Sequence, residues 1–544
     1  MGSLLSKNDI RRAVVESFSS DGNAVCRIDG FPVFVPFAAP GDEADIRIVK
    51  VKKQFAYGII ERLLVPSADR IAPDCPAFGR CGGCCFRHIS YESELAHKRR
   101  FAEDALRRIG GLPLSVSRIL AGDSPDRYRS KVQFPVCGQP PRYGLYAARS
   151  HRLVPCGDCR LQPALLNEIA SVSCCLLGEL GAAGYDEQTG TGDIRHLLLR
   201  ANSALTEVLV TVVANRLSFP WEKTFARRLT ERFPAVRTVA LNCNTRDTNV
   251  ILGSTTRTLL GPGYISDRLC GVPVAVDTHS FCQINHSAAE RLYGEIGRLA
   301  ALTGTETVLD LYCGAGTIGL SLAGSFSRLI GVETVPTAVE SARRAAAEMG
   351  VPHAEFFCAD AGQAAERLVR RGETIDVIVT DPPRAGCDRL TLDSMLALSP
   401  ARIVMVSCNA ATAARDCRYL CGNGYRAEEA VAVDLFPRTE HVETVCLLSK
   451  LQSKEHIEIE VKMDELDLTA AEKKATYEEI KTYVLEHTGL KVSNLYIAQV
   501  KQKCGIIERE NYNKPKSENV KQPQCPPEKE VAIMEALRYY GMIK

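Results

Sequence analysis

The stretch Thr307-Val-Leu-Asp-Leu-Tyr-Cys-Gly-Ala-Gly-Thr-Ile-Gly319 decides the fold of the largest part of this chain. An apolar run that predicts a strand leads into Gly314, Gly316 and Gly319, the spacing Gly-x-Gly-x-x-Gly. Such glycines let the backbone approach a nucleotide closely where a helix begins. The pattern alone does not identify the enzyme class, because dinucleotide-dependent enzymes carry it too.

Strands and helices alternate on both sides of this stretch, from about residue 264 to 450. This alternation is typical of a parallel, doubly wound α/β sheet of the Rossmann-like kind. We expect five strands with helices between them, at Thr307–Leu311, Arg328–Val332, Ala354–Phe357, Ile375–Thr380 and Arg402–Ser407.

Polar side chains stand where four of these strands end: Tyr312, Glu333, Asp381 and Cys408. Ligands of open parallel sheets lie outside the carboxyl ends of the strands, so these side chains should face one cleft. Glu333 is placed to accept hydrogen bonds from ribose hydroxyls. A Cys408 thiolate in that cleft can attack an electrophilic ring carbon. The alternative is a buried, inert thiol, which we expect for most of the 22 cysteines.

The motif Asp381-Pro-Pro-Arg384 narrows the chemistry, because it is typical of S-adenosylmethionine-dependent methyltransferases and has no use in hydride transfer. C5 of uracil is a poor nucleophile. Addition of the Cys408 sulfur to C6 would generate an enolate, whose C5 can take a methyl group from a sulfonium. The motifs therefore predict methyl transfer to a pyrimidine carbon.

This reaction also needs a base, because the C5 proton must leave before the sulfur is expelled. Glu443, which ends the motif Phe436-Pro-Arg-Thr-Glu-His-Val-Glu443, is our candidate. Glu440 and His441 are local competitors, and His441 has the more convenient ordinary pKa.

Together, Asp-Pro-Pro-Arg, Ser-Cys-Asn and Phe-Pro-x-Thr-x-His-Val-Glu resemble the RNA 5-methyluridine (uracil-C5) methyltransferases. The resemblance implies that Cys408 is the nucleophile and Glu443 the base. It also implies cofactor contacts from Gln283, in Phe281-Cys-Gln-Ile-Asn285. The other implied contacts with S-adenosyl-L-methionine are Tyr312, Glu333 and Asp381. Asp360 is a weaker candidate for the adenine.

A second signal is the cysteine cluster Cys75-Pro-Ala-Phe-Gly-Arg-Cys81-Gly-Gly-Cys84. Three thiols at this spacing beside glycines can wrap a small inorganic cluster, which normally needs a fourth ligand. A tetrahedral zinc site and surplus cysteines without metal are the alternatives.

The branch of the family with this cysteine spacing carries a [4Fe-4S] cluster, whose fourth ligand precedes a Leu/Ile-Gln pair. By resemblance, Cys159 in Cys159-Arg-Leu-Gln-Pro163 is that ligand. Cys85 and Cys156 lie close to the pattern and are either substitutes or bystanders. We expect the cluster to shape the RNA-binding domain without redox turnover.

Residues 8–65 contain five short alternating segments separated by Gly, Asp or Pro turn signals. This spacing predicts a small closed β-barrel of the OB-like kind. The segment resembles a TRAM domain, a barrel that is appended to several RNA-modifying enzymes.

The chain is therefore expected to be multidomain. We predict an OB-like barrel over residues 1–66 and a central α+β domain with the metal cluster over 67–263. A methyltransferase domain should occupy 264–450, followed by a helical tail over 451–544. The helix at about 91–118 should pack with the methyltransferase domain, as in the related enzymes.

In the tail, Tyr477–His487 and Ser493–Lys503 are predicted helices, and Pro515–Pro527 reads as a flexible connector. Two helices could form a helix-turn-helix. The enzyme motifs are complete before residue 451, however, so the role of the tail is open.

Composition sets limits. The chain has 544 residues and a net charge of +2, so any RNA contact must rest on a local patch. No apolar run approaches the roughly 18 residues that span a bilayer. Met1-Gly-Ser-Leu-Leu-Ser6 matches a loose myristoylation pattern, which we take as coincidence. We expect a cytoplasmic monomer without membrane contact.

These signals predict methylation of uridine C5 in 23S ribosomal RNA, on a uridine flipped out of its stack. Methylation of transfer RNA is the alternative, although transfer RNA enzymes of the family generally lack both the barrel and the cysteine cluster. A cytosine C5-methyltransferase is disfavoured, because its cysteine would follow Pro382 directly and Cys387 comes too late. A non-catalytic RNA-binding or assembly module is disfavoured by the intact Cys408 and Glu443.

Overall fold

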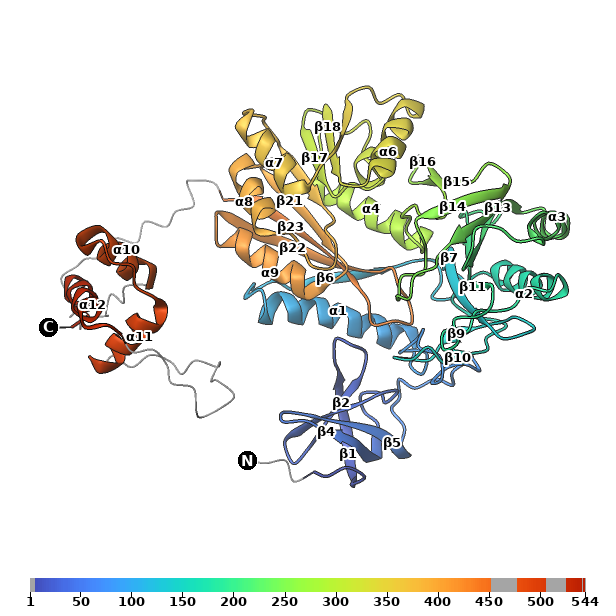
Figure 1. The fold of residues 1–544 in the computed structure, drawn as a ribbon, viewed down its shortest axis with the longest axis horizontal. Coiled ribbons are helices and arrows are strands. Elements are labelled where there is room, and N and C mark those ends of the chain that lie inside the picture. Colours follow the sequence, from blue (N-terminus) through green and yellow to red (C-terminus); the bar gives the residue numbers. More distant parts are fainter. Residues whose placement is uncertain (1–4, 452–476, 505–524, 541, 544) are drawn as a thin grey trace. The chain divides into compact units, whose positions relative to one another are not determined.

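The structure is a computed structural model, and it describes residues 5–451, 477–504, 525–540 and 542–543. Internal contacts divide the chain into two units, residues 1–454 and 455–544. The first unit contains an N-terminal barrel, a central sheet and a large C-terminal sheet (Figure 1).

The N-terminal barrel is closed by the strand order β1-β2-β3-β5-β4. Its strands are β1 Ile10–Phe18, β2 Ala24–Ile28, β3 Phe31–Val35, β4 Glu43–Val51 and β5 Ala56–Val65. Apolar side chains alternate inward along each strand, as a half-buried strand requires. Gly58 permits close packing here, because an added Cβ would come within 2.4 Å of Ile46 Cγ2. The predicted barrel is confirmed.

The central region is built on a six-stranded sheet of order β14-β13-β12-β11-β7-β8. Its strands are β7 Lys131–Cys137, β8 Arg142–Tyr143, β11 Ile194–Ala201, β12 Val208–Ala214, β13 Val236–Cys243 and β14 Thr255–Leu260. Helices α2 (Ala164–Glu179) and α3 (Glu222–Arg232) pack together against this sheet. Two small hairpins accompany it: β9 Leu145–Tyr146 with β10 Leu153–Val154, and β15 Ile265–Leu269 with β16 Val272–Val276.

The C-terminal sheet has eight strands in the order β19-β18-β17-β20-β21-β23-β22-β6. The five expected strands are present as β17 Thr307–Leu311, β18 Arg328–Glu333, β19 Ala354–Cys358, β20 Val377–Thr380 and β21 Arg402–Ser407. These five are parallel to one another, as predicted. The sheet is wider than the sequence indicated, by β22 Tyr425–Asp434, β23 Glu443–Lys450 and β6 Val116–Ala121.

Helices cover both faces of this sheet, which makes it doubly wound (Figure 1). One face packs on α1 Tyr91–Arg108, α7 Ala361–Arg370, α8 Arg389–Leu398 and α9 Ala410–Cys421. The other packs on α4 His286–Ala300, α5 Thr317–Ser321 and α6 Pro336–Glu348. Burial on both faces explains why the parallel strands are continuous apolar runs.

Helix α1 and strand β6 lie early in the chain but belong to the C-terminal sheet. Strand β6 pairs in parallel with β22 at the sheet edge, and Ala102 and Leu106 of α1 are buried in the core below it. Residues 91–121 thus pack with the later segment, the arrangement expected for the helix at about 91–118.

The described part of the tail contains three helices, α10 Tyr477–Thr488, α11 Asn494–Lys503 and α12 Pro527–Tyr539. They share a small apolar core that includes Ile480, Ile497 and Ile533. The first two helices were expected and the third was not. Most of the predicted connector Pro515–Pro527 lies outside the described residues, and its last residue begins α12.

Across the described residues, no helix combines the length and the apolarity that crossing a bilayer requires.

Candidate active site and cysteine pocket

The predicted catalytic and cofactor residues come together around one cavity of about 1610 Å³. Its lining includes Gln283, Tyr312, Glu333, Asp381, Cys408 and Glu443. The cavity lies at the carboxyl ends of β17, β18, β20 and β21, because each of these strands ends at or directly before one of these residues. It exceeds the usual 300–1,000 Å³ of a small-molecule site and so has room for a second molecule.

Glu333 is fixed beside the glycine turn by backbone donors. Its Oε2 accepts a hydrogen bond from the Gly314 N–H (3.1 Å), and its Oε1 accepts one from the Val335 N–H (2.9 Å). Gly316 has a φ of 73°, and an added Cβ there would lie 2.8 Å from the Phe356 ring. The turn thus requires glycine, and it leaves the cavity open beside a rigidly held carboxylate.

Two other predicted cofactor residues are positioned by neighbouring elements. Tyr312 follows β17 with a left-handed backbone (φ 62°), and its hydroxyl lies 3.4 Å from Thr391 Oγ1. Gln283 stands two residues before Asn285, which caps α4 and donates from Nδ2 to the Leu435 carbonyl (3.2 Å). The hydrogen bond from Asn285 to Leu435 connects the Gln283 segment to the residue that follows β22.

Cys408 occupies the turn between β21 and α9 and is half-buried, with its side chain in the lining of the cavity. Asn409 caps α9 by accepting a hydrogen bond from the Ala411 N–H (3.1 Å). Burial, followed by the charge of Glu443, raises the pKa of the Cys408 thiol, and Arg384 opposes this shift. The thiol is therefore not sealed in the apolar interior.

Glu443 begins β23 and is only 6% exposed. Burial raises the pKa of Glu443 well above its ordinary value of 4.5, Asp381 adds to the shift, and Arg384 opposes it. Burial also raises the pKa of Asp381, to about 6. A carboxylate whose proton affinity is raised in this way is suited to general base chemistry near neutral pH.

Arg384 is a cavity residue to which the sequence analysis gave no role, although its motif was quoted. Its Nη2 donates to His441 Nε2 (3.2 Å), because a guanidinium can only donate. His441 is therefore unprotonated at Nε2, and burial lowers the pKa of its ring. Arg384 is the cation that opposes the raised pKa values of Cys408 and Glu443.

The competing residues lie elsewhere. In the described part of the chain, the cavity lining contains Glu443 but neither Glu440 nor His441. Glu440 instead faces Cys85, whose Sγ lies 3.8 Å from its Oε2.

Asp360 and Cys387 also have structural partners. Asp360 caps α7 by accepting from the Gln363 N–H (3.1 Å). Cys387 is 5% exposed in the apolar core, and its N–H donates to Asp416 (2.8 Å). Neither belongs to the lining of the cavity within the described residues.

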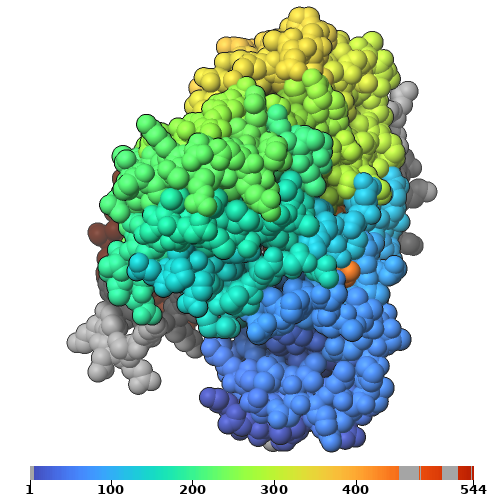
Figure 2. Space-filling model, turned by 90° about the vertical axis from the view of Figure 1, so that its right-hand side faces the viewer, coloured from blue at the N-terminus to red at the C-terminus, as the bar shows by residue number. Residues whose placement is uncertain are grey.

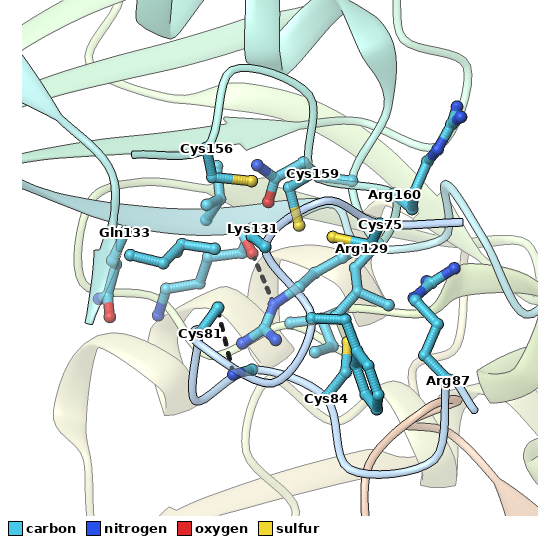
Figure 3. A pocket seen from close by; sticks show the side chains of 18 residues that line it. Cys75, Cys81, Cys84, Arg87, Arg129, Lys131, Gln133, Cys156, Cys159 and Arg160 are labelled. Carbon is cyan, nitrogen blue, oxygen red and sulfur yellow. Dashed lines mark hydrogen bonds between the residues drawn. The ribbon is translucent and has the colours of Figure 1, made fainter. Parts of the chain in front are cut away.

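A second, smaller cavity of about 290 Å³ is lined by cysteines (Figure 3). They are the four predicted ligands together with a fifth thiol: Cys75, Cys81, Cys84, Cys159 and Cys156. The side chains of Arg129, two residues before β7, and of Lys131, the first residue of β7, reach into the same space (Figure 3). The other near-neighbour of the pattern, Cys85, points away toward the loop before β23.

The glycines of this segment allow the loop to close around the cavity. The Gly83 N–H donates to Cys81 Sγ (3.3 Å), the kind of bond that stabilises a thiolate ligand. An added Cβ at Gly82 would lie 2.9 Å from Ala148 Cα. Among the described residues, no three His, Cys, Asp or Glu side chains are gathered as tightly as one metal ion requires. The structure thus places the cysteine thiols around one cavity, and the metal centre itself stays a prediction.

Comparison with known proteins agrees with the motifs. Residues 272–451 match the family described as tRNA (uracil-5-)-methyltransferase, and residues 7–60 match the TRAM domain. An uncharacterized RNA methyltransferase of Halalkalibacterium halodurans is 37% identical over 447 residues, which cover 82% of this chain and 98% of that relative. One from Listeria innocua is 36% identical, with 82% and 99% covered.

A solved structure shares the fold over most of this chain. The Pyrococcus abyssi tRNA (uracil-54, C5)-methyltransferase, in complex with S-adenosyl-L-homocysteine, is 27% identical with a TM-score of 0.65. It covers 80% of this chain and 99% of its own. The motif-based family prediction is confirmed: the chain belongs to the tRNA (uracil-5-)-methyltransferase family, as an S-adenosylmethionine-dependent RNA methyltransferase with an N-terminal TRAM domain.

Proposed function

We propose that this protein methylates C5 of a uridine in 23S ribosomal RNA through a covalent enzyme–RNA adduct. The observation that carries the proposal is the shared cavity, which is lined at once by Cys408, Glu443 and the residues expected to hold the cofactor. The Pyrococcus relative binds S-adenosyl-L-homocysteine, the product of a methyl donor that such a cavity would hold.

In the proposed reaction, the Cys408 thiolate adds to C6 of the uracil, and the C5=C6 electron pair moves to the C4 oxygen as an enolate. C5 of the enolate then takes the methyl group from the sulfonium, which leaves as a neutral thioether. Glu443 removes the C5 proton, the C5=C6 double bond forms again, and the sulfur of Cys408 departs as a thiolate. The enzyme is thus regenerated after Glu443 passes its proton to solvent.

Three observations support Glu443 as the base. It lines the cavity together with Cys408, it is buried, and its pKa is raised. His441 accepts a hydrogen bond from Arg384, which occupies the ring nitrogen that a base would use. Glu440 lies toward Cys85.

Gln283, Tyr312, Glu333 and Asp381 are the proposed contacts with S-adenosyl-L-methionine. Glu333 suits the ribose hydroxyls, because its carboxylate is held at the glycine turn by backbone donors. Asp381 lines the same cavity as Glu443 and Cys408, and its charge raises the pKa of both groups.

Transfer RNA is the second candidate substrate, and one observation favours it. The Pyrococcus relative, a tRNA methyltransferase, covers 80% of this chain, far more than the C-terminal sheet alone. A shared barrel and central region therefore do not exclude transfer RNA. Sequencing 5-methyluridine in 23S ribosomal RNA and in transfer RNA, from cells with and without this protein, distinguishes the two. Loss from neither RNA would overturn the proposed function.

We further propose that Cys75, Cys81, Cys84 and Cys159 hold a [4Fe-4S] cluster. The thiols surround a cavity of about 290 Å³, and Gly83 donates to one sulfur. A single zinc ion would need its sulfurs about 2.3 Å from one point, which is a much smaller arrangement. Bound iron and acid-labile sulfide in protein purified without oxygen would support the cluster, and stoichiometric zinc without sulfide would contradict it.

A further inference from the structure

The loop that precedes the proposed base is held by residues that lie more than three hundred positions earlier in the chain. This loop, Phe436–His441, lies between β22 and β23, and only Val442 separates it from Glu443. Pro437 and Arg438 within it are buried although they belong to no strand or helix. On one face of the molecule, orange atoms from beyond residue 400 lie between the blue N-terminal and the teal central segments (Figure 2).

The main holding element is a buried ion cluster around Lys98 of α1. The side chains of Lys98, Glu94 and Asp434 are each 0% exposed. Lys98 Nζ lies 2.9 Å from Glu94 Oε1 and donates to Asp434 Oδ1 (2.8 Å) and to the Phe436 carbonyl (3.0 Å). The Tyr91 hydroxyl donates to the second oxygen of Asp434 (2.8 Å). One ammonium group thus joins α1 to the end of β22 and the start of the loop.

Arg438 extends the cluster into the middle of the loop. Its backbone N–H donates to Glu94 Oε1 (2.6 Å), and its guanidinium Nη1 lies 3.4 Å from Glu94 Oε2. Its backbone is left-handed, with a φ of 69°. Arginine rarely adopts this conformation, so the surrounding contacts must hold it there.

The cysteine pocket contributes a second set of contacts. The backbone N–H groups of Cys85 and Phe86, directly after Cys84, donate to the Arg438 carbonyl (2.9 and 3.3 Å). The Tyr128 hydroxyl donates to the Pro437 carbonyl (3.0 Å). The loop is therefore fixed from two sides, by α1 and by the chain that leaves the pocket.

A buried ion cluster of this kind contributes little net stability to a fold, because the loss of hydration offsets the attraction between the charges. Burial alone would lower the pKa of Lys98, but Glu94 and Asp434 outweigh it and raise that pKa, so the ammonium stays charged. Replacing such groups by apolar side chains of similar size is often neutral or stabilising in other proteins. Buried charges are better explained where they fix one arrangement of a functional segment.

We propose that Lys98, Glu94, Asp434 and Arg438 are positioning residues that hold the Phe436–His441 loop so that Glu443 reaches the C5 proton. The inference rests on the proposed function. It assigns the ion cluster to one step, the removal of that proton after methyl transfer. Cofactor binding and cysteine addition should depend on it much less, because Tyr312, Glu333 and Cys408 belong to other segments. Only the Gln283 segment is connected to the residue after β22, through Asn285 and Leu435.

The test uses Lys98→Met in the full-length protein, which keeps an unbranched side chain one atom shorter and removes the charge. We expect turnover to fall by about ten- to a hundredfold, less than the 10²–10⁴-fold that a positioned base typically supplies. The distinctive result is accumulation of the methylated covalent adduct during turnover, seen as a protein band shifted by RNA on a denaturing gel. Affinity for S-adenosyl-L-homocysteine should stay within about twofold of wild type.

Tyr425→Phe is the matched control. Tyr425 begins β22, the strand that Asp434 ends, and its buried hydroxyl donates to the Pro400 carbonyl (2.7 Å). This substitution also removes a buried hydrogen bond from the same strand, but at the end remote from Glu443. It should lower thermal stability without raising the adduct fraction above wild type.

Tyr91→Phe is a less disruptive variant. It tests the positioning role if Lys98→Met does not fold. It removes one hydrogen bond to Asp434 and should raise the adduct fraction by a smaller factor. Folded variants with a wild-type adduct fraction would overturn the positioning role. If wild type forms no 5-methyluridine and Glu443→Gln traps no adduct, the proposed function itself fails, which is a distinguishable result.

Discussion

The two cavities of this molecule are assembled in opposite ways. The large cavity takes Tyr312, Glu333, Asp381 and Cys408 from the ends of four different parallel strands, whereas the small one takes three of its five cysteines from a single ten-residue loop. Sheet topology brings the first set together, and loop length alone brings most of the second. The comparison shows that a known strand order predicts which distant residues meet in a cavity. A run of nearby cysteines, in contrast, does not by itself identify every ligand of a site.

Removal of the proposed nucleophile should have the largest effect on methyl transfer in the large cavity. Cys408→Ala should lower methyl transfer by about 10⁴-fold or more, because the C6 adduct can no longer form. Binding of S-adenosyl-L-homocysteine, measured by calorimetry, should be nearly unchanged. A loss of cofactor affinity equal to the loss of activity would mean that Cys408 is structural and that the strand-end argument fails at this position.

Removing the base should stop the reaction later. Glu443→Gln is expected to lower turnover by about 10²–10⁴-fold and to trap a covalent RNA adduct on a denaturing gel, because the C5 proton stays in place. His441→Ala supplies the control, since His441 lies in the same loop but outside the lining of the cavity in the described residues. If His441→Ala traps the adduct and Glu443→Gln turns over normally, the base is His441.

The small cavity can be examined through its two neighbouring thiols. Cys159→Ser should lose most of the bound iron and sulfide, and Cys156→Ser should keep them, because Cys159 is the expected fourth ligand. Iron analysis of both variants, purified without oxygen, measures this. The opposite result would exchange the roles of the two residues, and equal retention would show that either thiol completes the site.

Arg384 should produce the smallest effect, a shift in pH dependence. The pKa of Cys408 is raised by burial and by Glu443, so the thiolate fraction and the single-turnover rate should rise with pH in the alkaline range. Arg384 opposes the shift in pKa, so Arg384→Gln should move this rise to higher pH and lower the rate at fixed pH by up to about tenfold. Arg384→Lys keeps the charge and should restore most of the profile. An unchanged profile for Arg384→Gln would exclude Arg384 from thiolate stabilisation.

Much of the fold follows from local patterns in the sequence. The five parallel strands are predicted to within two residues at each end, because buried parallel strands are apolar runs bounded by glycine and polar residues. Helix α1 and the barrel also follow from periodicity. The shared cavity then results from a general rule about the carboxyl ends of strands. The individual roles of its residues remain predictions.

Other features of the fold produce no periodic pattern in the sequence. Strands β22 and β23 flank the motif that attracted attention for its chemistry, and β6 joins the sheet edge from more than three hundred residues away. The contacts of Lys98 with Asp434 also join distant residues, and a lysine in an amphipathic helix ordinarily lies in solvent. Such pairings are decided by tertiary packing, so a single sequence could not reveal them.

The position of β6 at the edge of the C-terminal sheet has a consequence for how the protein is made and divided. During synthesis, α1 and β6 leave the ribosome long before β22, the strand with which β6 pairs, has been made. Their apolar side chains therefore stay exposed to solvent until β22 is complete. A fragment that starts at residue 264 would never acquire them. It would expose the β22 edge and the surface that Ala102 and Leu106 cover, and we expect it to aggregate. A truncation that is meant to isolate the catalytic half should therefore retain residues 85–121, for example by joining them through a short linker to the later segment.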